Sequence, residues 1–300
     1  MASSSKKVIY AALIGNGLIA VTKFIASFLT GSSAMLSEGI HSVVDTGNQL
    51  FMLLGIRLAK KPADERHPFG HGKEIYFWTF IVAMMIFAVG GGISLYEGIH
   101  SIMDPHPIHN PYINYGVLGL AMVFEAGAWY YAWREFKTQR GKRGYVEAVR
   151  KEKDPTTFAV LFEDSAAMLG LMVAFGGIVA GQLTGNPVYD GISSVIIGLI
   201  LVLTAGWLAY ETKSLLIGEG ARVDIEQGIR SIATGQDEIQ TVHEILTLHM
   251  GPHFILATIS VDYRDNIESQ VVEDSIQTLN QLIKQKYPRI KRVFVEVRGR

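Results

Sequence analysis

The stretch Ser33–Ala59, with the sequence SAMLSEGIHSVVDTGNQLFMLLGIRLA, decides the fold of this chain. It is long enough to cross a bilayer as one helix, because a span needs about 20 mostly apolar residues. It also carries His41 and Asp45, which are one helical turn apart, so both side chains project from the same face. Ionisable groups are costly at membrane depth and usually serve a function there. The stretch therefore predicts a polar site inside a membrane domain.

A second apolar stretch, FAVLFEDSAAMLGLMVAFGGIVAG at 158–181, carries the adjacent carboxylates Glu163 and Asp164. An imidazole and carboxylates that converge between helices form a ligand set for a divalent transition metal, and Zn²⁺ is the first choice. The alternative on these residues alone is a hydrogen bond between helices, which polar side chains also supply in membranes.

The composition agrees with a membrane protein. Of the 300 residues, 49% are hydrophobic and only 18% are charged, and the mean hydropathy is positive. The net charge of -1 provides no global field for binding nucleic acid. The chain has no cysteine, which excludes disulfides, thiolate metal ligands and thiol catalysis.

Six segments are long enough to cross a hydrocarbon layer of about 30 Å as helices. We expect them at Val8–Leu29, Ser33–Ala59, Ile75–Ile102, Tyr112–Phe136, Thr156–Leu183 and Val188–Ile217. Lysine and arginine precede the first span and occupy the connections after the second and fourth, whereas the other three connections contain none. The positive-inside rule then predicts a multi-pass protein with both termini in the cytoplasm. With no clear transit peptide, a bacterial inner membrane is the default expectation.

The chain changes character after Gly218, beyond which no apolar run is long enough to cross the membrane. Helical periodicity and strand-like runs alternate there in the order αββαβ. The elements are expected at Asp224–Thr234, Val242–His249, Ile255–Asp262, Ser269–Lys286 and Arg292–Val297. We therefore expect a six-helix transmembrane domain at 1–217 and a cytoplasmic α+β domain at 218–300.

The segments SEGIHSVVDTGNQ (37–49) and ADERHPFGHGKEIYFWTF (63–80), together with the αββαβ tail, resemble the cation diffusion facilitator family of zinc transporters. The resemblance covers nearly the whole chain. It implies a homodimeric secondary transporter, not an enzyme, that moves divalent metal out of the cytoplasm, commonly in exchange for protons.

The resemblance also implies a transport site built from two i, i+4 pairs, one in the second span and one in the fifth. His41 and Asp45 match the first pair, and Asp164 matches the second member of the other. The first member of that pair falls at Val160, which cannot bind metal. Glu163 lies about 100° around the helix from Asp164, so a three-ligand site is favoured, with Glu163 as the alternative fourth ligand.

A further family site, in the cytoplasmic loop, falls on Asp64, His67 and His71. The alternative interpretation is that HPFGHGK is a structural turn, since Pro68 and Gly70 favour a loop.

The family's third site, in the tail, falls on His243 and Glu296, with Thr258 and Arg298 at its remaining positions. His249 would share a strand face with His243, because the two are an even number of residues apart. The alternative is that these are ordinary polar strand residues.

Other polar residues lie in the spans outside the family pattern. Lys23 is expected to pair with a carboxylate or to reach the membrane surface. Glu38 is expected to act as a proton acceptor or a structural hydrogen-bond partner. Asn16 and Asn48 can bond to metal ligands or between helices, and Glu125 is central to the fourth span.

Export of Zn²⁺ is the predicted function, with protons and the lipid bilayer as the other partners. Transport of Mn²⁺, Fe²⁺ or Co²⁺ is an alternative, because carboxylates outnumber histidine if Glu163 joins the site. An intramembrane metalloenzyme is a second alternative, although the sequence contains no H-E-x-x-H motif. A metal sensor that does not transport is a third.

Overall fold

The computed structural model describes the backbone of residues 2–140 and 155–299, and the side chains of 16–134, 136–137 and 158–299. Most of the basic connection after the fourth predicted span, at 141–154, lies outside the described residues. Contacts divide the chain into two compact units. The first contains the long helices up to Thr212, and the second contains Ile56–Tyr76 and the chain from Lys213 onward.

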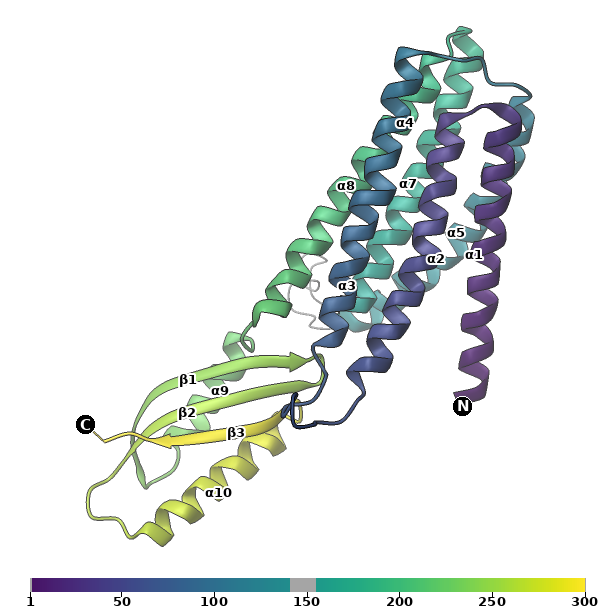
Figure 1. Cartoon of the computed structure of the whole chain (residues 1–300). Coiled ribbons are helices and arrows are strands. Elements are labelled where there is room, and N and C mark those ends of the chain that lie inside the picture. Colours follow the sequence, from purple (N-terminus) through teal and green to yellow (C-terminus); the bar gives the residue numbers. More distant parts are fainter. Residues whose placement is uncertain (1, 141–154, 300) are drawn as a thin grey trace. The chain divides into compact units, whose positions relative to one another are not determined.

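Six long helical segments form the first part of the described chain, as predicted (Figure 1). They are α1 (Ala2–Thr30), α2 (Ser33–Ala59), α3 (Glu74–Met85) continued by the π-helix η1 (Ile86–Gly91) and α4 (Gly92–Met103), α5 (Pro111–Arg140), α7 (Pro155–Thr184) and α8 (Val188–Ile217). Within the described part, three are both long and apolar enough to cross a membrane: Glu74–Met103, Phe158–Thr184 and Val188–Ile217. Asn16–Thr30 is a shorter apolar helix.

Local sequence explains where these helices begin and end. Gly31 has a φ of +72° and Gly185 a φ of +69°, and this left-handed conformation closes the short connections after α1 and α7. Pro111 and Pro155 occupy the first residues of α5 and α7, where a missing N–H costs nothing.

The N-terminus of α2 is held by Asp190, near the start of α8. The Asp190 carboxylate accepts hydrogen bonds from the hydroxyl groups of Ser32 (2.6 Å) and Ser33 (2.9 Å) and from the Ser33 backbone N–H. A carboxylate there satisfies N–H groups that a helix leaves unpaired and complements its dipole. Ser37 and Ser194 continue the contact, with their hydroxyl oxygens 2.8 Å apart. These bonds set how the polar face of α2 is turned.

Glycines allow α4 and α8 to approach within backbone contact. A Cβ at Gly98 would lie 2.6 Å from the backbone nitrogen of Val195, and a Cβ at Gly191 would lie 2.9 Å from that of Ile102. Small residues permit such close helix packing in membranes.

Replacing Gly191 by alanine is expected to lower the free energy of unfolding by about 1–3 kcal/mol, because the added methyl group meets backbone that cannot move aside. Gly206→Ala, on the same helix, is the matched control, since nothing lies within 4 Å of a Cβ there. That control should be neutral or should gain up to about 1 kcal/mol from helix propensity. Thermal unfolding of both variants in detergent measures the difference, and equal midpoints would contradict the packing argument.

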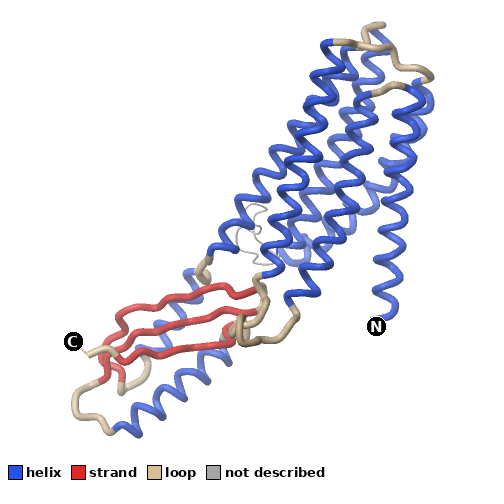
Figure 2. The backbone as a smooth tube through the Cα atoms, viewed as in Figure 1, coloured by secondary structure: helices blue, strands red, loops and turns tan. Residues whose placement is uncertain are grey.

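The second unit contains the predicted αββαβ arrangement, α9 (Val223–Thr234), β1 (Ile239–Gly251), β2 (Phe254–Tyr263), α10 (Ser269–Lys286) and β3 (Ile290–Val297). The strands follow the order β1-β2-β3, with β1 antiparallel and β3 parallel to β2. Figure 2 shows these strands as the only red segments among the described residues. Apolar residues of α9 and α10 form the core with the sheet, including Ile229, Ala233, Ala257, Ile259, Leu279 and Ile283.

Candidate functional site

Helices α2 and α7 bring four polar side chains together, and we call them the α2–α7 cluster: His41, Asp45, Asn48 and Glu163. Nδ1 of His41 lies 3.3 Å from Oδ1 of Asp45. The side-chain amide of Asn48 donates a hydrogen bond of 2.7 Å to Oε1 of Glu163. The carboxyl groups of Asp45 and Glu163 lie within hydrogen-bonding reach of each other. Two carboxylates this close repel each other unless a proton or a cation lies between them.

Several atoms of the α2–α7 cluster lack a hydrogen-bond partner among the described residues. They are both ring nitrogens of His41 and one side-chain oxygen each of Asp45 and Asn48. Only 1% of His41 and 9% of Asp45 is exposed. Leaving a buried polar atom unpaired costs about 1–3 kcal/mol. Imidazole nitrogen and carboxylate oxygen are ordinary ligands of divalent metal, so a metal ion would satisfy these atoms.

Glu163 and Asp164 have different surroundings on α7. Glu163 is buried and contacts both Asn48 and Asp45. Asp164 is half-buried, and the charged groups that act on it are Glu163 and Glu125. Glu163, which the expected three-ligand site did not include, is thus the α7 carboxylate that contacts α2. Asn48 lies seven residues after His41 and three after Asp45. This spacing indicates in the sequence that Asn48 shares their face of α2.

Lys23 of α1 pairs with a carboxylate, one of its two expected arrangements. Its ammonium group lies 2.9 Å from Oε2 of Glu38 and donates a hydrogen bond of 2.8 Å to the hydroxyl of Ser42. Both charged side chains are buried. Removing one partner of such a pair leaves the other charge uncompensated, so the pair ties α1 to α2.

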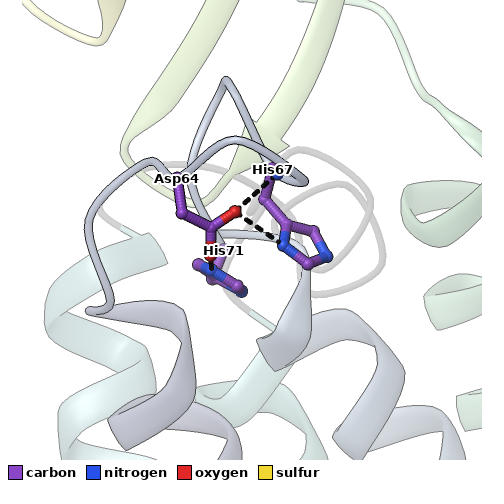
Figure 3. A group of neighbouring side chains, drawn as sticks. All are labelled: Asp64, His67 and His71. Carbon is purple, nitrogen blue, oxygen red and sulfur yellow. Dashed lines mark hydrogen bonds and ion pairs between the residues drawn. The ribbon is translucent and has the colours of Figure 1, made fainter.

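The second candidate centre is the loop cluster, Asp64, His67 and His71, drawn in Figure 3. One oxygen of Asp64 lies 3.1 Å from Nδ1 of His67, and the other lies 3.0 Å from Nε2 of His71. Among the residues that the structure describes, only this group has three or more metal-binding side chains whose ligand atoms all lie within 4.8 Å of one another. Two imidazoles and a carboxylate suit Zn²⁺ and leave a position open for a further ligand.

The backbone of this loop is shaped by Asp64, as the loop interpretation of HPFGHGK requires. Its carboxylate accepts hydrogen bonds from the backbone N–H groups of Arg66 (3.0 Å) and His67 (2.7 Å). Gly70, with a φ of +83°, then donates its N–H to the His67 carbonyl at 2.8 Å. Hydrogen bonds lower the pKa of Asp64 to about 2. The bond from the His71 side chain has the largest effect, and the bond from the His67 backbone has the next largest.

The loop cluster also lies against the sheet of the second unit. A side chain at Gly72 would overlap the carbonyl oxygen of Met250 at the turn between β1 and β2, and it would lie 3.3 Å from the Cα of Gly251. His71, the residue before this contact, has a side chain only 11% exposed, whereas that of His67 is 52% exposed. The turn is therefore structural as well as rich in metal ligands.

We expect Zn²⁺ binding at the loop cluster to depend on the negative charge of Asp64. The pKa of Asp64 is depressed to about 2, so its stabilising contribution is complete above about pH 4 and is lost only as the pH falls toward 2. Asp64→Asn keeps the side-chain shape without the charge and should weaken binding about 10-fold or more at pH 7.

Calorimetry of the whole chain in detergent measures this binding, in an Asp45→Ala background that removes a ligand of the α2–α7 cluster. Glu65→Gln, in the same exposed loop, is the matched control. Equal binding in Asp64→Asn and Glu65→Gln would contradict the assignment.

The tail residues do not gather in the same way. A bulge between Val242 and Glu244 interrupts the pairing of β1 with β2 at His243. The bulge shifts the alternation of faces, so His243 is exposed while His249 is 2% exposed, and the two histidines do not share a face. Glu296 is exposed on β3. Neither His243 nor Glu296 belongs to a close group of three metal-binding side chains within the described chain.

Comparison with known proteins identifies the family of this chain. Residues 9–217 match the family described as the cation efflux transmembrane domain. The chain is 31% identical over 284 residues to the mitochondrial proton-coupled zinc antiporter SLC30A9 of Xenopus laevis, covering 92% of this chain and 51% of that protein. It is 29% identical to the human protein of the same name, covering 92% of this chain and 50% of that one.

A bacterial relative matches over most of both chains. The cation-efflux pump FieF of Klebsiella pneumoniae is 26% identical over 289 residues, covering 95% of this chain and 89% of the relative. In contrast, this chain spans only about half the length of the antiporters.

Proposed function

Because this chain belongs to the cation efflux family, whose members are membrane transporters and not enzymes, we propose that it exports Zn²⁺ from the cytoplasm in exchange for protons. The observation that carries the proposal is the set of unpartnered buried atoms on His41, Asp45 and Asn48. An imidazole with two carboxylates, those of Asp45 and Glu163, is a Zn²⁺ ligand set with an open position. An open position suits a carrier that must release its ion.

Proton exchange follows from the chemistry of these ligands. Imidazole and carboxylate must lose their protons before they bind metal, so protons and metal compete for the same atoms. Protons that arrive from outside displace the ion, and the site releases them again when it binds metal from the cytoplasm. The two curated antiporter relatives are named as proton-coupled, which supports this exchange.

Mn²⁺, Fe²⁺ or Co²⁺ is the second candidate substrate. The placement of Glu163 against Asp45 supports it, because a site with more carboxylate than histidine favours harder ions than Zn²⁺. His41 is the ligand that favours Zn²⁺ in this comparison.

The topology and assembly complete the proposal. Both termini lie in the cytoplasm, which the distribution of lysine and arginine supports. The chain is divided into a transmembrane domain at 1–217 and a cytoplasmic domain at 218–300, because no apolar run after Gly218 is long enough to cross the membrane. The tail joins two protomers and senses metal. Because His243 and Glu296 form no close group within the described chain, they serve as ligands only together with side chains of the second protomer. The bacterial inner membrane is retained as the expected location.

Flux into proteoliposomes tests the proposal. The purified chain is reconstituted with a metal-sensing dye and a pH-sensing dye inside, and Zn²⁺ or Mn²⁺ is added outside. We expect metal entry coupled to proton movement in the opposite direction, with Zn²⁺ preferred when both ions compete. Metal entry without proton movement would overturn the exchange, and preference for Mn²⁺ would select the second candidate. No entry of either ion would overturn transport itself.

A further inference from the structure

A polar cavity lies beside Asp45, among residues of α1, α2 and α5. Its lining consists of Asn16, Ile19, Ser42, Asp45 and Glu125. Four of these five residues have side-chain oxygen atoms, and two of them are carboxylates from different helices. Glu125 lies on α5 and does not belong to the histidine and carboxylate pattern on α2 and α7.

Asp45 connects this cavity with the α2–α7 cluster. It lines the cavity, and it lies 3.3 Å from His41 and within reach of Glu163. Asp45 is 9% exposed, and its Oδ1 has no hydrogen-bond partner among the described residues. A buried carboxylate oxygen without a hydrogen-bond partner is costly, so an ion bound beside Asp45 would be favourable.

The positive charge of Lys23 is bonded to other residues. Lys23 acts electrostatically on both Asp45 and Glu125, but its ammonium group is bonded to Glu38 and to Ser42. Glu38 balances the charge of Lys23. When both are ionised, the carboxylates of Asp45 and Glu125 carry two negative charges, which match one divalent cation.

We propose that this cavity is an oxygen-lined cation subsite, with Glu125 as its ligand from α5 and Asp45 as the ligand that it shares with the α2–α7 cluster. Carboxylate, amide and hydroxyl oxygens bind hard divalent ions and commonly leave water on the metal. The subsite thus takes a divalent ion, and Asp45 passes the ion to His41. The proposal rests on the transport function proposed above and adds a second position on the path of the ion.

Substitution of Glu125 tests the subsite. Glu125→Gln preserves the size of the side chain and removes its charge. We expect the affinity of the purified full chain for Mn²⁺, measured by electron paramagnetic resonance in detergent, to fall about 10-fold or more. Zn²⁺ affinity, which depends on His41, should fall less. Glu97→Gln is the matched control, because Glu97 is also a half-buried glutamate in a long helix but does not line the cavity.

The outcomes separate the subsite from the transport function. Unchanged Mn²⁺ affinity in Glu125→Gln, or an equal loss in Glu97→Gln, would overturn the subsite. If the wild-type chain transports metal while Glu125→Gln binds Mn²⁺ normally, only the subsite fails. If the wild-type chain carries neither metal in proteoliposomes, the proposed function fails as well.

A second measurement leaves Glu125 intact and so does not depend on the folding of that variant. The chain contains no cysteine, so Ile19→Cys places a single thiol in the cavity. A cationic methanethiosulfonate reagent should label this thiol, and Mn²⁺ should slow the labelling several-fold. Leu18→Cys, at a position 62% exposed and outside the cavity lining, is the control and should show no protection. Equal rates for Ile19→Cys with and without Mn²⁺ would overturn the proposal.

Discussion

Replacing Asp45 by alanine is expected to reduce metal flux about 100-fold or more, the largest effect of any single substitution in this chain. Asp45 contacts His41 and Glu163 and also lines the cavity that Glu125 lines. Its loss removes a ligand that the α2–α7 cluster shares with the cavity, so metal binding is weakened at both positions of the proposed path. Proteoliposome flux with a metal-sensing dye measures the change.

Thr46→Ala is the control for this experiment. Thr46 is the next residue on α2, and its hydroxyl bonds the carbonyl of Ser42 in its own helix at 2.9 Å. It should transport like the wild type. Size-exclusion chromatography and thermal unfolding establish that both variants are folded. Normal flux in a folded Asp45→Ala variant would remove the α2–α7 cluster from the transport mechanism.

Glu163→Gln is expected to have the second largest effect, a loss of Zn²⁺ affinity of about 10-fold or more. The substitution keeps the hydrogen-bonding shape but removes a buried negative charge that lies beside Asp45. Asp164→Asn is the matched comparison, because Asp164 is the adjacent carboxylate on α7 and is less buried than Glu163. It should weaken binding less.

Calorimetric titration of Zn²⁺ in detergent, in an Asp64→Asn background that removes a ligand of the loop cluster, compares the two variants. A greater loss in Asp164→Asn than in Glu163→Gln would support the three-ligand site of His41, Asp45 and Asp164. Equal losses would place both carboxylates on the metal.

The loop cluster was predictable because its residues are close in the chain. Asp64, His67 and His71 lie within one short loop, and a glycine at position 70 allows the turn that brings them together. His243 and His249 were less tractable, although they also lie on one strand. The bulge at His243 is a feature of the pairing between two strands, and alternation along a single strand does not reveal it.

The sequence by itself determined the long helices and the αββαβ tail, because hydrophobic period, span length and turn residues act over a few neighbouring positions. It also determined that His41 and Asp45 share a helical face. Only the tertiary structure decided that Glu163 meets Asn48, that Lys23 meets Glu38 and that Glu125 meets the cavity beside Asp45.

The physical reason is that the rotation of a helix about its own axis is set by what it packs against. The bond from Asn48 to Glu163 joins residues 115 positions apart, and the bonds from Ser33 to Asp190 join residues 157 positions apart. The close approach of Gly98 and Gly191 fixes α4 against α8 in the same way. Local periodicity determines which residues share a face, whereas these distant contacts determine which neighbour that face meets.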